Sequence, residues 1–184
     1  PPAALVQALE TLGEVDLHLV NEGRHELLWT VLGSRLHEYD GPMGPVKGVA
    51  FAVWAPRAKA VRVIGDFNDW DGRIHPMRML GGSGVWELFV PDVGVGNIYK
   101  YEIRGADDVV RTKADPMARR TECPPNTGSV VDASGHEWGD AQWMEQRARS
   151  NPHTGPMSTY EVHLGSWRQG LSYREMAEHL VNYV

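Results

Sequence analysis

The sequence is poor in cysteine and phenylalanine, and it has no long hydrophobic run. A single cysteine, Cys123, among 184 residues excludes an internal disulfide bond and a cysteine-rich zinc site. The same shortage fits a reducing compartment, so we expect a cytoplasmic protein. No apolar run approaches the ~18 residues that a membrane span needs, and no signal peptide opens the chain. We therefore expect no membrane partner.

Basic charge is also scarce, and the motifs of metal and cofactor sites are missing. The 18 Lys and Arg residues are outnumbered by 24 Asp and Glu residues, which leaves a net charge of −6 and argues against a nucleic-acid partner. The eight histidines form no HExxH or H-x-x-x-H pair, and no phosphate-binding or dinucleotide-binding loop occurs. Three aspartates, Asp66, Asp69 and Asp71, gather in one turn without the spacing of a calcium loop. We predict that they cap backbone N–H groups, and that the chain has neither a metal site nor another cofactor.

What the sequence has in quantity is glycine, proline and tryptophan, with 20, 12 and 7 residues. From Gly48 onward, apolar residues alternate with a period of two in short segments separated by turn residues. These segments are predicted strands at 49–56, 60–67, 85–91, 97–103 and 108–112. Many short strands with frequent turns favour a β-sandwich.

The N-terminal part gives a different prediction. Residues 15–20 alternate, and residues 22–33 place Leu27, Leu28, Val31 and Leu32 at helical spacing with Gly33 as a stop. Residues 34–48 are rich in glycine and proline and are predicted to be a connection.

The C-terminal part combines a loop region with two helices and a strand. We predict a helix near 140–149, a strand at 157–164 and a helix from 172, where Ser172 and Glu175 have the spacing of a capping box. This last helix has an apolar stripe and no stop signal. Two interpretations follow: the helix is cut short at Val184, or it is a frayed terminal helix that docks on the core.

The tryptophans are the best lead to function, because no nucleophile or carboxylate pair stands out as an active site. Trp86 lies in an alternating strand and is predicted to be in the core, whereas Trp54 is assigned to a strand without a defined face. Trp70 lies in the polar segment GDFNDWDG, which cannot be the interior of a strand. An indole at such a turn either covers the edge of the sandwich or stacks on a sugar ring.

Two segments carry a family resemblance. FAVWAPRAKAVRVIGDFNDWDG (51–72) and GVWELFVPDVGVGNIYKYEI (84–103) resemble the carbohydrate-binding modules of family 48. LGEVDLHLVNEGRHELLWTVLG (12–33), ADP (114–116) and STYEVHLGSWR (158–168) are similar to the bacterial 1,4-α-glucan branching enzymes, most of all to the actinobacterial forms.

The resemblance implies a domain organisation. Residues 1–34 would connect from a preceding domain, and 35–135 would be an immunoglobulin-like β-sandwich module. Residues 136–156 would be a linker, and 157–184 would be the first strand and helix of a truncated (β/α)₈ catalytic barrel. The expected fold class is therefore mainly β, followed by the first β-α unit of a barrel. Its catalytic carboxylates, which act by retaining transglycosylation, would lie beyond Val184, so no catalytic residue is assigned.

The resemblance also implies a glucan-binding site. Trp70 and Lys100 match positions of the family's glucan face, Asn126 is a looser match, and Asn68 is a hydrogen-bonding neighbour of Trp70 in the same turn. Two departures occur. The second tryptophan of dedicated binders is replaced by residues 104–108, which leaves weak binding or a packing role as alternatives, and residues 32–35 differ from the usual L-G-A-H.

The implied function is therefore to supply the glucan-binding and positioning module of an enzyme that forms the α-1,6 branches of glycogen. The expected partners are an α-1,4-glucan and the catalytic and N-terminal domains of the same chain. Two other hypotheses remain: a non-catalytic α-glucan-binding module, and the module of a debranching or trehalose-releasing hydrolase.

Overall fold

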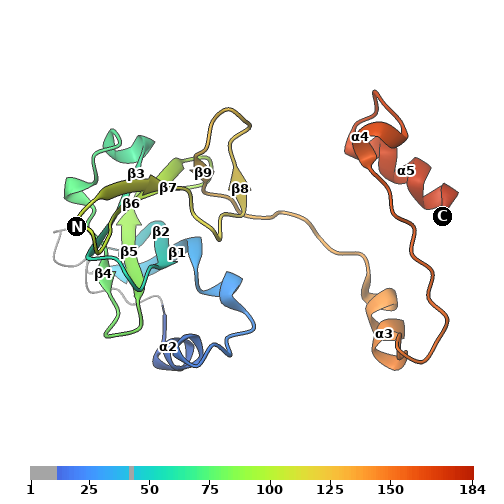
Figure 1. Cartoon of the computed structure of the whole chain (residues 1–184), viewed down its shortest axis with the longest axis horizontal. Coiled ribbons are helices and arrows are strands. Elements are labelled where there is room, and N and C mark those ends of the chain that lie inside the picture. Colours follow the sequence, from blue (N-terminus) through green and yellow to red (C-terminus); the bar gives the residue numbers. More distant parts are fainter. Residues whose placement is uncertain (1–11, 42–43) are drawn as a thin grey trace. The chain divides into compact units, whose positions relative to one another are not determined.

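The computed structural model describes residues 12–41 and 44–184 (Figure 1). The chain divides into two compact units, with the boundary between Gly135 and His136. Within the described ranges no helix is long and apolar enough to cross a membrane. The part of the predicted N-terminal connection at 1–11 lies outside the described residues.

The first unit contains two antiparallel sheets. One has the strand order β1-β2-β5-β4 and the other has β3-β6-β9-β8, with β7 also paired to β6. The strands are β1 Gly33–Gly41, β2 Gly44–Trp54, β3 Ala60–Gly65, β4 Arg78–Met79, β5 Val85–Pro91, β6 Ile98–Arg104, β7 Val110–Lys113, β8 Arg120–Thr121 and β9 Ser129–Val130. Five of them confirm the segments predicted from the alternation, with boundaries shifted by a few residues.

The core lies between the two sheets because alternate residues of each strand point inward. On β2 these are Val49, Phe51 and Val53, and they join buried residues of the opposite sheet, namely Val61, Val63, Tyr99 and Tyr101. Trp86 is only 7% exposed and belongs to the same core, which confirms its predicted place.

The other face of β2 is buried as well, by a segment that the alternation could not reveal. Ala52 and Val85 pack with Leu12, Val31 and Leu32, so the N-terminal segment covers the back of the first sheet. The predicted helix over 22–33 is therefore wrong, since its apolar residues serve as this cover. The helix lies earlier, as α2, Glu14–Asn21, and is followed by Gly23 with φ of +67°. Before β1 there is then only a 3₁₀ turn, η1 Leu28–Thr30.

The prediction of a connection over 34–48 is also wrong. β1 and β2 form a hairpin in register from Gly33↔Ala52 to Gly41↔Gly44. Of the glycines that suggested a loop, Gly41 and Gly44 pair at the turn end of this hairpin. Gly48 lies inside β2, where close approach requires it, because a Cβ there would stand 2.8 Å from Pro91 Cα.

The second unit contains three helices: α3 Ala141–Arg149, α4 Leu164–Trp167 and α5 Tyr173–Tyr183. The first and last confirm the predicted helices. Residues 157–163 form no strand, because no neighbouring strand among the described residues offers them a ladder. The strand predicted at 157–164 is thus wrong for this structure.

The start of α5 has the predicted capping box. Ser172 Oγ accepts from the backbone N–H of Glu175 at 3.4 Å, and Glu175 Oε2 accepts from the backbone N–H of Ser172 at 2.8 Å. We predict that Ser172→Ala makes the first-turn amides of α5 exchange with deuterium roughly fivefold faster, because the cap is lost. Ser158→Ala, outside any helix, should leave these rates unchanged, and equal rates in both variants would contradict the role of the cap.

Candidate functional site

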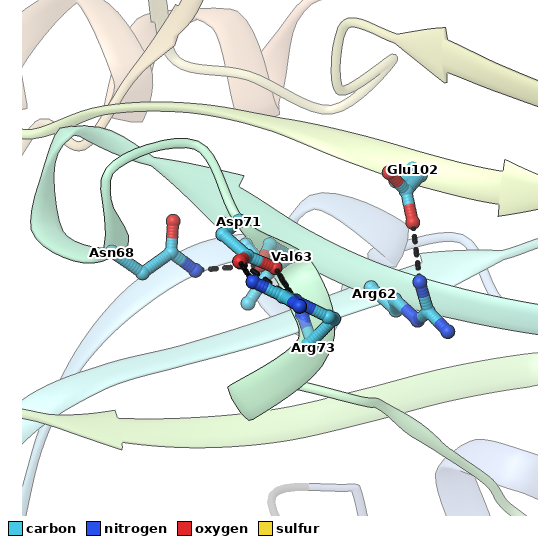
Figure 2. Close-up of polar contacts among 6 residues, drawn as sticks. All are labelled: Arg62, Val63, Asn68, Asp71, Arg73 and Glu102. Atoms are coloured by element: carbon cyan, nitrogen blue, oxygen red, sulfur yellow. Dashed lines mark hydrogen bonds and ion pairs between the residues drawn. The ribbon is translucent and has the colours of Figure 1, made fainter.

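The candidate site lies on the face of the β3-β6 pair that points away from the core. The register pairs Arg62 with Glu102 and Ile64 with Lys100, so these four side chains share the outer face. Arg62 Nη1 donates to Glu102 Oε1 at 2.8 Å across the two strands, as Figure 2 shows. The turn that follows β3 packs against this outer face.

The turn after β3 presents Trp70 in a rare backbone conformation. It contains the 3₁₀ turn η2, Asp66–Asn68, followed by Asp69 and Trp70 with φ of 52° and 60°. Left-handed conformations of non-glycine residues cost on the order of 1 kcal/mol each and persist only where the surroundings enforce them. Two in succession therefore mark a turn that is held in place by strong contacts.

Those contacts come from Asn68, which is 6% exposed. Its Oδ1 accepts from the backbone N–H of Gly65 at 2.8 Å, and its Nδ2 donates to the carbonyl oxygen of Val63 at 3.0 Å. The same Nδ2 lies 2.8 Å from His75 Nδ1. Figure 2 shows the amide nitrogen directed at Val63 of β3. Asn68 thus stabilises the turn, and its amide forms its hydrogen bonds with groups of the protein.

Trp70 itself is 44% exposed, on a turn that lies over the outer face of β3. A Cβ on Gly72 would stand 2.8 Å from Arg62 Cβ and 2.9 Å from Ile64 Cγ2, so the turn makes close contact with that strand. Lys100 is one strand further along, opposite Ile64. The turn of Trp70 and the side chain of Lys100 therefore border the same part of the sheet.

The loop after β8 reaches this region from the other side. Lys100 Nζ donates to Thr127 Oγ1 at 2.6 Å, next to the exposed Asn126. Glu122 holds the loop, since its Oε1 accepts from Asn126 Nδ2 at 3.1 Å and its Oε2 from the backbone N–H of Gly128 at 2.9 Å. Thr127 was missed by sequence reasoning, although it adjoins Asn126 in the same N-T-G turn.

Charged groups complete the surroundings of Trp70. Asp71 forms an ion pair with Arg73, whose Nε is 2.8 Å from Asp71 Oδ2 (Figure 2). The guanidinium of Arg73 lowers the pKa of Asp71 to about 2 through hydrogen bonds. Asp66 accepts from the backbone N–H of Ile98 at 3.0 Å, and Asp71 Oδ1 accepts from the backbone N–H of Arg73 at 3.0 Å. The prediction that these aspartates bind backbone N–H groups is confirmed for Asp66 and Asp71.

The turn at 104–108, where the family resemblance led us to expect a second tryptophan, is ionic. Asp107 is paired with Arg111 at 2.6 Å, and Asp108 with Lys59 at 2.6 Å and with Arg104 at 2.8 Å. Trp54, which is 57% exposed, belongs to the other sheet. The outer face thus carries an exposed indole on the turn over β3, and a lysine, an amide and a hydroxyl on β6 and the loop after β8. Such groups suit a neutral sugar ring with an apolar face and a belt of hydroxyls. Among the described residues no group of three or more His, Cys, Asp or Glu could hold a metal ion.

The sequence of this chain is similar to a known family of modules and to a group of named enzymes. Residues 32–118 match the family described as Carbohydrate-binding module 48 (Isoamylase N-terminal domain). Proteins named 1,4-alpha-glucan branching enzyme GlgB are 60% identical over 94% of this chain in Rhodococcus jostii and 60% identical over 96% in Mycolicibacterium paratuberculosis. In both cases the match covers 24% of the relative, so the chain spans about a quarter of the length of these proteins.

Solved structures give a more distant similarity. PulA from Klebsiella pneumoniae aligns with a TM-score of 0.43 and 24% identity, over 71% of this chain and 10% of that chain. Pullulanase from Bacillus acidopullulyticus aligns with a TM-score of 0.42 and 26% identity, over 55% of this chain and 12% of that chain.

Proposed function

Because residues 32–118 match the family described as Carbohydrate-binding module 48, we propose that this chain binds an α-1,4-glucan through the outer face of the β3-β6 pair. The observation that carries the proposal is the exposed indole of Trp70 on a turn held in a strained conformation beside Lys100. Strain that is held by a dedicated buried amide is typical of functional sites.

Each proposed site residue has a separate task. Trp70 stacks on the apolar face of a glucose unit, while Lys100 and Asn126 donate hydrogen bonds to its hydroxyls. Asn68 acts from beneath, because its buried amide holds the turn. Thr127 keeps the ammonium group of Lys100 in place.

We propose further that the parent protein is a 1,4-α-glucan branching enzyme that forms α-1,6 branches by retaining transglycosylation. Identity near 60% to proteins of that name supports this more than a debranching hydrolase or a free-standing module. In that enzyme residues 157–184 would be the first strand and helix of the catalytic barrel, and the strand would form once its neighbours pair with it. The catalytic carboxylates would come from other parts of the parent, which we place in the cytoplasm with glycogen as its substrate.

Glucan binding is tested by calorimetric titration of the chain with maltoheptaose and with cellohexaose. We expect binding of the α-glucan alone, because the curved α-1,4 chain brings successive units onto Trp70 and Lys100. The proposed site would be wrong if both oligosaccharides bound with equal affinity or if neither bound.

Lys100→Met is expected to weaken maltoheptaose binding about tenfold, since a hydrogen bond from a charged donor contributes about 1.5 kcal/mol. Methionine keeps the apolar stem of the side chain and removes only the ammonium group. Lys47→Met is the matched control, because Lys47 lies on the other sheet and is paired with Glu38 at 3.5 Å. A parallel loss of affinity in both variants would indicate a non-specific effect of charge.

A further inference from the structure

His75 closes the turn that carries Trp70. It follows the 3₁₀ turn η3, Gly72–Ile74, and its backbone N–H donates to the carbonyl oxygen of Gly72 at 3.1 Å. Its own carbonyl oxygen accepts from the backbone N–H of Val63 at 3.1 Å, which ties the end of the turn to β3. The half-buried ring packs against Phe67 with 5.7 Å between ring centroids. His75 is therefore fixed in position relative to the strand below Trp70.

The hydrogen bonds of Asn68 determine which nitrogen of His75 carries a proton. Asn68 Oδ1 faces the N–H of Gly65 and Nδ2 faces the carbonyl of Val63, so the amide has only one orientation that satisfies both. The second hydrogen of Nδ2 then points to His75 Nδ1 at 2.8 Å. Nδ1 must accept this bond, so the ring is neutral with its proton on Nε2. A protonated ring would place an N–H against an NH₂ group at this distance.

Asn68 also supports the backbone of Trp70, through its own carbonyl oxygen and through Gly65. The carbonyl oxygen of Asn68 accepts from the N–H of Asp71 at 2.9 Å, and the carbonyl oxygen of Gly65 accepts from the N–H of Trp70 at 2.9 Å. Gly65 is held in turn by Asn68 Oδ1. The hydrogen bonds that hold Asp69 and Trp70 in the left-handed conformation therefore depend on Asn68. The last hydrogen bond of the Asn68 side-chain amide is made to His75.

We propose that neutral His75, acting through Asn68, is a positioning residue for Trp70, and that protonation of His75 releases the turn and weakens glucan binding. This inference rests on the proposed glucan site and adds a pH dependence to it. His75 does not touch the sugar; its effect is on the geometry of the indole.

The charged groups on the turn and on β3 are either bonded to other partners or exposed. On the turn, Asp71 pairs with Arg73, and Asp66 accepts from Asn97 and Ile98; Asp69 is exposed. On β3, Arg62 pairs with Glu102. Burial lowers the pKa of His75 below its usual value of about 6.5. The neutral ring therefore predominates at neutral pH, and the support it gives is lost as the pH falls below about 6.5 and through the lowered pKa of the folded state.

The test compares maltoheptaose affinity at pH 7.5 and pH 5.0 for the 184-residue chain and two variants. The wild type should lose about tenfold in affinity on acidification, in line with the loss of a buried hydrogen bond. His75→Asn places an oxygen acceptor where Nδ1 was and cannot be protonated, so its affinity should stay constant. His37→Asn is the matched control: His37 is also half-buried with a lowered pKa, but it lies on β1 of the other sheet and should keep the wild-type profile. A loss of affinity in His75→Asn equal to that of the wild type would overturn the proposal.

A measurement without glucan separates this inference from the proposed function. Nitrogen-15 NMR of the free chain should show His75 with its proton on Nε2 at pH 7.5, and the amide signal of Trp70 should shift with the same midpoint as the His75 ring. If these results hold while no glucan binds, the positioning role stands and the proposed function fails. A proton on Nδ1 at neutral pH, or a Trp70 signal that ignores the titration of His75, would refute the positioning role whatever the binding result.

Discussion

Trp70→Ala is expected to weaken maltoheptaose binding roughly thirtyfold, about 2 kcal/mol, because the variant loses the apolar surface that a glucose ring would cover. The side chain is 44% exposed and makes no contribution to the core, so the variant should unfold at nearly the same temperature as the wild type. Calorimetric titration measures the affinity, and circular dichroism measures the thermal midpoint.

Trp54→Ala is the matched control for this prediction. Trp54 is also well exposed, at 57%, but it lies at the end of β2 in the other sheet, with its indole N–H donating to the carbonyl oxygen of Ser83 at 3.3 Å. Its removal should leave the affinity within a factor of two. If Trp54→Ala lost binding and Trp70→Ala kept it, the glucan site would belong on the opposite sheet.

Asp115→Ala is expected to destabilise the first unit by about 3–5 kcal/mol. Asp115 is 5% exposed, and its Oδ2 accepts from the hydroxyls of Tyr99 at 2.6 Å and Tyr101 at 3.1 Å. Its Oδ1 accepts from the backbone N–H of Met117 at 2.7 Å. Alanine would leave three donors without this acceptor, two of them on fully buried tyrosines, and each unsatisfied buried group costs about 1–3 kcal/mol.

Urea unfolding followed by tryptophan fluorescence checks this value through the shift of the midpoint. Tyr101→Phe is the control, because it removes one donor and leaves the carboxylate bonded to Tyr99 and Met117, so a loss of only about 1 kcal/mol is expected. A midpoint for Asp115→Ala equal to that of Tyr101→Phe would show that the network contributes no more than one ordinary hydrogen bond.

The structure gives a physical role to Asp115, which the sequence singled out only by resemblance. The tripeptide at 114–116 contributed to the resemblance but carried no visible task in the sequence. In the structure this aspartate ties the segment between β7 and β8 to β6 through the hydroxyls of Tyr99 and Tyr101. It also ties that segment to β9, because its backbone N–H donates to Ser129 Oγ at 2.8 Å. The reason for the residue is a set of partners 14 to 16 positions away, which no local pattern displays.

The candidate site was only partly predictable, because some of its contacts also join residues that are distant in the sequence. Trp70 and Lys100 were indicated by the motifs around them, and the structure places them beside one part of the sheet. Asn68 was expected as a neighbour that bonds the sugar, but it is buried and bonded to β3 and His75. An asparagine in a polar turn has the same local sequence whether its amide points to solvent or to the protein, so only the fold distinguishes the two.

Local sequence by itself determined the elements whose signals lie within a few residues. The period of two marked five strands, the S-x-x-E box marked the start of α5, and glycine, asparagine and aspartate marked the turns between strands. These signals act through backbone sterics and short-range hydrogen bonds, which do not depend on distant segments.

Tertiary structure alone decided burial and pairing. It buried both faces of β2, converted the apolar residues at 28–32 into a cover for the first sheet, paired β1 with β2, and left 157–163 without a ladder. It also left Trp54 exposed, for which the sequence defined no face. Burial and strand pairing depend on which distant segment packs against a residue, and that information is spread over the whole chain.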